Sequence, residues 1–243
     1  MLVSSPVSPR GEALTATQRT ALNEYFERHH ASETPTRTPL LLALVLAGDK
    51  PATHITPASW AFSGTSCETD THFRAFLDTL GLAAHHLTGM SGWFVAPSRG
   101  RFGLLPSTAR TRANAAWHRR LGIVFGYPSA AIEYFIHTDH EDRTQPKERL
   151  AAGEFGSEEM AYTEFVFYVH DDSLDGYTQA IETGKTVRAR FTDLATRWDL
   201  PVLDALADEV YQEAVAVYTG DKAAFAGELI DFTMIATNPR SRS

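Results

Sequence analysis

Residues 121–128 read Leu121-Gly122-Ile123-Val124-Phe125-Gly126-Tyr127-Pro128, an apolar run with two glycines that is closed by Tyr-Pro. We call this stretch the junction. Glycine permits a positive φ or a close backbone approach, and Pro128 keeps Tyr127 out of the helical region. The junction is therefore predicted to be a tight crossing between two secondary-structure elements. Two interpretations stay open: it presents backbone amides to a ligand, or it serves only to pack two helices closely.

The apolar periodicity on either side of the junction predicts a helix-rich α+β fold with a small sheet. The run at 40–47 is either a buried strand or a short core helix, 162–169 has the composition of a strand, and 93–96 with 102–105 are expected to form a hairpin. Helices are predicted at 17–30, around 73–80 with Gly81 as the stop, and at 111–120, 174–198 and 201–220.

The length of 243 residues fits one large domain. We predict a single α+β domain over 14–236, with a surface insertion at about 137–159, because that segment is charged and rich in turn residues. The polar ends at 1–13 and 237–243 are predicted to be flexible tails.

Composition narrows the classes of function. The formal net charge of −8 disfavours nucleic acid and anionic membrane as partners, since both reward a surplus of Lys and Arg. No apolar run approaches the roughly 20 residues of a membrane span, and a single cysteine, Cys67, excludes a disulfide-stapled secreted fold. We expect a soluble, cytoplasmic protein. Four lysines against eighteen arginines indicate a GC-rich genome, a halophilic archaeon being one source that fits.

The strongest candidate for ligand contact lies at the junction. Guanidinium groups hold a carboxylate or phosphate in a planar fork, and exposed amides add donors. Lys50, in a second turn at 47–51, is expected to converge on the same place. The alternative is a solvated helix end beside a packed core. The candidate binding residues are Lys50, Arg119, Arg120, Gly122, Gly126 and Tyr127.

Histidines and carboxylates cluster at 137–142. His137 and His140 are three residues apart, so on a helical turn they could share a divalent metal ion. The competing interpretation is a solvated, acidic loop after a helix end. A second cluster, His170 with two aspartates, is expected to supply a helix cap through Asp172 or Ser173, which leaves His170 without an assigned role.

Three segments together resemble a family of functionally uncharacterised prokaryotic proteins, a domain of unknown function. They are the Ala-Gly-x-Lys-Pro turn at 47–51, the helix that ends in Leu80-Gly81, and the Leu-Gly-x-x-x-Gly-Tyr-Pro junction with the helix after it. The chain lacks the cysteine that members often carry before the first turn. The resemblance implies an intracellular location and one compact domain. Because the family has no assigned chemistry, it implies no catalytic residue.

Two classes of function remain from the sequence. The first is a protein that binds a small ligand or a metal ion near the junction, with enzymatic activity left open. The second is a non-catalytic interaction or regulatory protein that uses the helices at 174–218 as a surface for a protein partner. The substrate and the reaction are not encoded in any recognisable motif.

Overall fold

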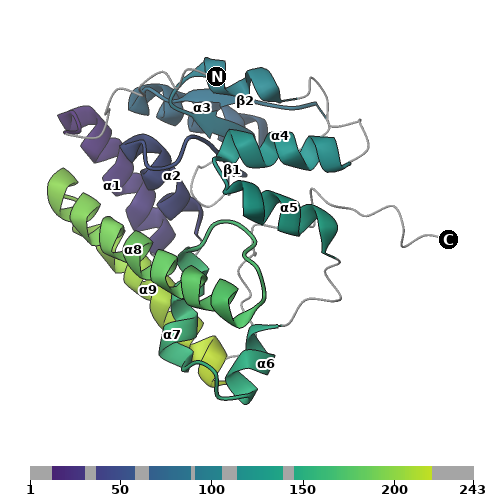
Figure 1. The fold of residues 1–243 in the computed structure, drawn as a ribbon. Helices are drawn as coiled ribbons and strands as arrows, with labels where there is room; N and C mark the ends of the chain where they lie inside the picture. The colour runs from purple at the N-terminus through teal and green to yellow at the C-terminus, as the bar shows by residue number, and fades with distance from the viewer. Residues whose placement is uncertain are drawn as a thin grey trace.

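A computed structural model describes residues 13–30, 37–57, 66–88, 91–105, 114–138 and 145–220, with the backbone alone for 66–69. The predicted helix-rich α+β fold with a small sheet is confirmed (Figure 1). In chain order the elements are α1 (Ala16–His30), α2 (Thr38–Ala47), β1 (Thr53–Ile55), α3 (Ser66–Leu80), β2 (Ala83–His85), β3 (Trp93–Ala96), the 3₁₀ helix η1 (Arg99–Leu104), α4 (Ala115–Phe125), α5 (Ser129–His137), α6 (Pro146–Ala151), α7 (Ser157–Ala161), the 3₁₀ helix η3 (Tyr162–Phe165), α8 (Leu174–Trp198) and α9 (Pro201–Thr219).

The sheet is antiparallel in the order β1-β3-β2, so β3 is its central strand. Successive side chains of a strand point to opposite faces. Phe94 and Ala96 accordingly enter one hydrophobic core, while Val95 enters another. The small sheet thus separates two cores and belongs to both.

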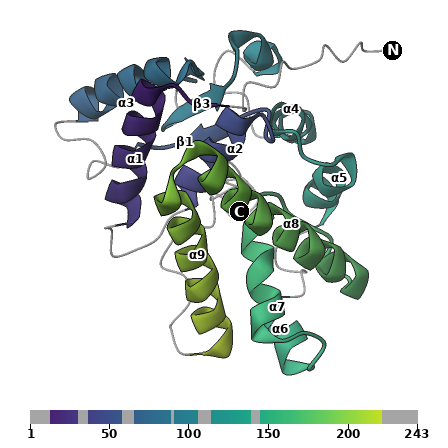
Figure 2. The same cartoon turned by 90° about the vertical axis from the view of Figure 1, so that its left-hand side faces the viewer.

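The larger core is built from α1, α2, α3, α8 and α9, and the smaller one from α4, η1 and the second face of the sheet. Helix α2 has buried side chains at every position from 39 to 47. A helix that is apolar on all its faces is typically buried, and the sequence of α2 fits this rule. Figures 1 and 2 show α2 inside the molecule, with α1 and α9 to one side and α4 and α5 to the other. Of the two interpretations of 40–47, the structure selects the core helix.

The predicted strand at 162–169 is wrong. Residues Tyr162–Phe165 form η3, and 166–169 follow without strand pairing. The side chains there are of the kind that strands favour, yet strand propensity depends on a neighbour to pair with. Helix α8 lies against this segment instead, and Gly184 leaves room for the Tyr162 carbonyl. Phe165 is fully buried, so the aromatic residues serve the core from a helical turn.

The predicted hairpin is wrong in its second half. Residues 93–96 form β3, but 102–105 belong to η1 and the turn that ends it. Strand β3 is already paired on both sides by β1 and β2, so a third partner has no edge to join. Arg101 of η1 donates instead to the carbonyls of Val124 (3.0 Å) and Ile123 (2.7 Å), which ties η1 to the end of α4.

The predicted helices are confirmed where they are described, and α4 runs further than expected, through Gly122 to Phe125. None of the described residues between 145 and 159 is buried, although whether this segment is an insertion stays a prediction. The predicted tails lie outside the described residues, apart from Ala13. Within the described part of the chain, no helix combines the length and apolarity that crossing a bilayer would require.

Candidate functional site

The junction is the end of one helix and the start of the next. Gly126 follows α4 with φ +73°, and its amide donates to the Ile123 carbonyl at 3.2 Å. The Tyr127 amide reaches back to the Gly122 carbonyl at 2.9 Å, which completes a glycine-based helix cap. Pro128 then sets the entry to α5. These amides are therefore occupied by the helix cap and do not face a ligand.

Both glycines are needed for close approach. A Cβ on Gly122 would lie 2.5 Å from Ile132 Cγ1 of α5, and a Cβ on Gly126 would lie 2.5 Å from Pro51 Cγ. Real Cβ atoms do not approach carbon this closely, so α5 and the 48–51 turn both rely on the missing side chains. The predicted tight crossing between two elements is confirmed.

Lys50 meets the junction, as expected from the two turns. Its Nζ donates to the Phe125 carbonyl at 3.2 Å and lies 4.4 Å from the centroid of the Tyr127 ring. That carbonyl is at the C-terminal end of α4, where the helix dipole favours a cation. The Lys50 residue is 8% exposed. Burial lowers the pKa of Lys50 to about 7 and raises the pKa of the Tyr127 hydroxyl.

The two arginines point elsewhere. Arg119 makes a bidentate pair with Glu133 of α5, with both N–O distances at 2.7 Å. The pair raises the pKa of Arg119 and lowers that of Glu133. Arg120 is exposed, and no ion pair joins it to another described residue. The fork that was predicted to hold a ligand anion is occupied, on Arg119, by a carboxylate of the chain itself.

Of the two residues of the predicted metal site, only His137 lies among those that the structure describes, so the site stays a prediction. His137 is exposed, and its Nε2 lies 3.4 Å from Glu133 Oε2. His140 lies outside the described residues. Across the ranges that the structure does describe, no three His, Cys, Asp or Glu side chains are grouped so that they could hold a metal ion. The N-cap of α8 is Ser173, which was one of the two residues predicted to cap this helix.

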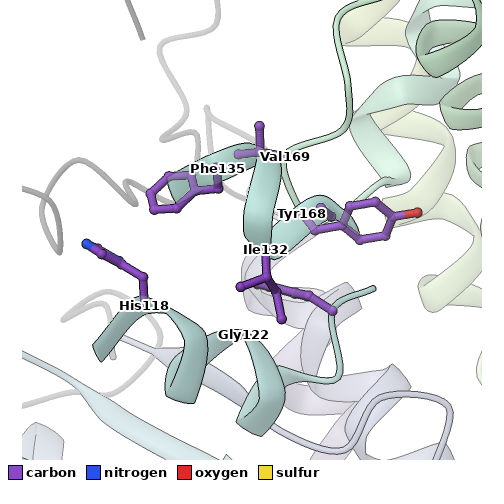
Figure 3. A pocket seen from close by; sticks show the side chains of 8 residues that line it. His118, Gly122, Ile132, Phe135, Tyr168 and Val169 are labelled. Carbon is purple, nitrogen blue, oxygen red and sulfur yellow. The ribbon is translucent and has the colours of Figure 1, made fainter. Parts of the chain in front are cut away.

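A narrow cleft opens where α4, α5 and the segment after η3 meet. Figure 3 shows Gly122 and Ile132 at its centre, His118 and Phe135 to one side and Tyr168 to the other. The remaining lining residues are Tyr127, Ala131 and Val169. The enclosed volume is about 20 Å³, room for a water molecule or a group of similar size. Gly122 and Tyr127 are the predicted site residues that border it.

His118 is the polar side chain that the sequence interpretation missed. Its ring lies between Trp117, at 5.3 Å and nearly perpendicular, and Phe135 at 5.1 Å. Nδ1 is buried and has no hydrogen-bond partner among the described residues. Burial lowers the pKa of His118, so the ring is neutral at pH 7. One signal in the sequence could have identified His118. It is four residues before Gly122, so the two residues lie on the same face of α4.

Comparisons with protein families, with curated proteins and with solved structures found no match. The family resemblance drawn from the turn at 47–51 and from the junction therefore stays a prediction.

Proposed function

We propose that this protein binds a small, neutral, mainly apolar molecule in the cleft between α4 and α5. Two observations carry the proposal: the lining is mainly aliphatic and aromatic, and His118, one of the lining residues, has a buried Nδ1 without a hydrogen-bond partner among the described residues. Ligand sites are typically apolar, with a few polar groups that fix orientation. His118 Nδ1 is such a group here.

Size and charge restrict the ligand. The enclosed part of the cleft takes only a group the size of a water molecule, so the rest of a ligand would lie toward solvent between side chains such as Phe135 that are themselves half-buried. An anion gains little there, because Arg119 is engaged by Glu133 and an apolar lining penalises charge. A short alcohol, aldehyde or ketone satisfies both restrictions, since its one polar atom can meet His118.

The test uses two neighbouring alanines of α5. Ala131 is buried against the cleft, whereas Ala130 is exposed on the same helix. Ala131→Leu fills the cleft, while the matched control Ala130→Leu adds the same atoms to the solvent face. Isobutanol, cyclopentanol and toluene serve as neutral probes, butyrate is the charged comparator, and binding is followed by NMR chemical shifts and thermal stability.

We expect the neutral probes to shift resonances of α4 and α5 in the wild type and in Ala130→Leu, and to bind at least about tenfold more weakly to Ala131→Leu, a loss of about 1.4 kcal/mol. Butyrate should bind most weakly of the four. Equal binding by the two variants, when both keep the wild-type melting temperature, would reject the cleft as the site.

The hypothesis of a partner surface on α8 and α9 rested on their aromatic content. The aromatic residues Tyr177, Phe191 and Trp198 of α8 are all buried in the structure. Leu174 is the large hydrophobic residue on these helices that stays exposed among those described. The partner surface stays a prediction. No contact among the described residues favours it over ligand binding.

A further inference from the structure

The chain has only four lysines, at positions 50, 147, 185 and 222, and Lys50 differs from the two others that the structure describes. Lys147 is exposed. Lys185 pairs with Glu182 at 2.7 Å, and that pair raises its pKa. Lys50 is buried at the meeting point of α2 and α4.

Among the residues that the structure describes, no carboxylate compensates the burial of Lys50. The adjacent carboxylate, Asp49, points away and pairs with Arg190 of α8 at 2.7 Å. Among the described residues no acidic group lies within ion-pair distance of the Lys50 amine. Its neighbours are the Phe125 carbonyl and the faces of the Phe125 and Tyr127 rings. A buried ammonium with only these partners favours loss of its proton.

The amine is also close to the cleft. Tyr127 lines the cleft and also covers the Lys50 amine, whose Nζ is 4.4 Å from the ring centroid. Tyr127 is therefore next to both the cleft and the Lys50 amine. Tyr127 keeps partial exposure, unlike the fully buried Phe94 beneath the neighbouring Phe125 ring. Because Lys50 is not part of the lining, a molecule in the cleft reaches the amine only if the Tyr127 side chain moves.

We propose that Lys50 is a nucleophilic amine that condenses with a small aldehyde or ketone bound in the cleft. This inference rests on the proposed function, because the cleft delivers the carbonyl compound. The nitrogen lone pair attacks the carbonyl carbon, a C–N bond forms and the C–O bond breaks. The two amine protons leave with the carbonyl oxygen as water, and the product is an imine. No oxidant, reductant or metal is required.

Two features suit the amine to this step. With a pKa of about 7, roughly half of Lys50 is uncharged at pH 7, against roughly one molecule in 2,500 for an ordinary lysine. The Phe125 carbonyl accepts one N–H, which holds the nitrogen in place while an apolar surrounding excludes competing water.

The test traps the imine in the wild-type protein. The protein is incubated at pH 7 with butanal and cyanoborohydride, which reduces an imine to a stable secondary amine, and peptide mass spectrometry follows each lysine over time. We expect butylation of Lys50 at least about tenfold faster than that of Lys185, since the neutral fraction decides the rate. Slower modification of Lys50 than of Lys185 overturns the inference.

Ala131→Leu separates this inference from the proposed function. Loss of both isobutanol binding and Lys50 butylation in Ala131→Leu, with Ala130→Leu unaffected, supports both. Isobutanol binding without butylation of Lys50 in the wild type overturns the inference alone. Rapid butylation that persists unchanged in Ala131→Leu overturns the delivery of the carbonyl through the cleft. Lys50→Met serves as the blank that assigns the modified peptide.

Discussion

At the scale of single residues, Gly126 joins two distant parts of the chain. It takes a left-handed φ of +73°, and its missing side chain lets Pro51 approach. Lys50, the residue before Pro51, donates from its amine to the carbonyl of Phe125, the residue before Gly126. Gly126 therefore lies beside the contact made by the buried lysine. Its left-handed backbone and its close approach to Pro51 can be measured separately.

Gly126→Ala is expected to destabilise the protein by about 2–4 kcal/mol, from about 1 kcal/mol of left-handed backbone strain plus the steric clash with Pro51. Gly48→Ala is the matched control. Gly48 also caps a helix in the left-handed region, at φ +83°, but a Cβ there meets nothing within 4 Å. The loss from Gly48→Ala should stay near about 1–2 kcal/mol. Urea unfolding gives both values, and equal losses would show that the contact with Pro51 is unimportant.

Lys50 makes stability depend on pH at neutral to alkaline values. Its pKa is about 7 in the folded protein and roughly 10.4 in an unfolded chain. Between these values the unfolded chain binds more protons, so the free energy of unfolding rises with pH, by about 1 kcal/mol per unit near pH 8. Below pH 7 the full cost of burying the charged amine remains.

The variant Lys50→Met removes this dependence. Urea unfolding between pH 7 and 9 should give a free energy that rises for the wild type and changes much less for Lys50→Met. His29, His54 and His118 have lowered pKa values and titrate below this window, so they leave the comparison intact. Parallel curves for the two proteins would mean that Lys50 stays charged in the fold.

At the scale of elements, the sequence predicted helices well because their signals are local. The stops at Gly81 and Gly220 are both left-handed caps in the structure, and the 3.6-residue period found α8 and α9. The strand at 162–169 failed because a strand needs a partner, and nothing local reveals that β3 is already paired on both edges.

The candidate site was predictable only in part. The predicted convergence of Lys50 on the junction is confirmed. The turn at 47–51 and the junction pack closely against each other, with Pro51 against Gly126. The pairing of Arg119 with Glu133 depends on how α4 and α5 cross, which the residue types alone do not give. Tyr168 was assigned to a strand, so its place in the cleft could not be foreseen.

Glu164 connects three elements through one carboxylate. It pairs with Arg37 at the start of α2 (3.0 Å) and accepts a hydrogen bond from the Tyr218 hydroxyl near the end of α9 (2.8 Å). The Arg37 and Glu164 side chains are only 12% and 14% exposed. Glu164→Gln leaves the guanidinium nearly buried without its counter-charge, so we expect a loss of about 2–4 kcal/mol in urea unfolding.

The control for this prediction is Glu182→Gln, which breaks the pair with Lys185 on the surface of α8. The Glu182 side chain is 66% exposed, and such pairs contribute about 0–0.5 kcal/mol. A loss from Glu164→Gln no larger than that of this control would mean that water compensates Arg37.

At the scale of the whole molecule, the sheet lies between two cores of unequal size. The larger core spans α1, α2, α3, α8 and α9, and among the described residues the smaller core contains mainly α4, η1 and one face of β3. Stability within a domain follows the local amount of buried apolar surface. Helices α4 and α5 also border the cleft, so they have less packing on that side.

Native-state hydrogen exchange should therefore resolve two levels of opening. Amides of α2, which is buried along its whole length, should exchange only through global unfolding, whereas amides of α4 and α5 should exchange at least about tenfold faster, about 1.4 kcal/mol lower in free energy. Isobutanol should slow exchange in both sets, because local opening of α4 and α5 and global unfolding both destroy the cleft, and a ligand that binds only the native protein raises the free energy of each. Uniform protection across both sets would show a single cooperative unit, and no change in either set with isobutanol would mean that isobutanol does not bind the native cleft.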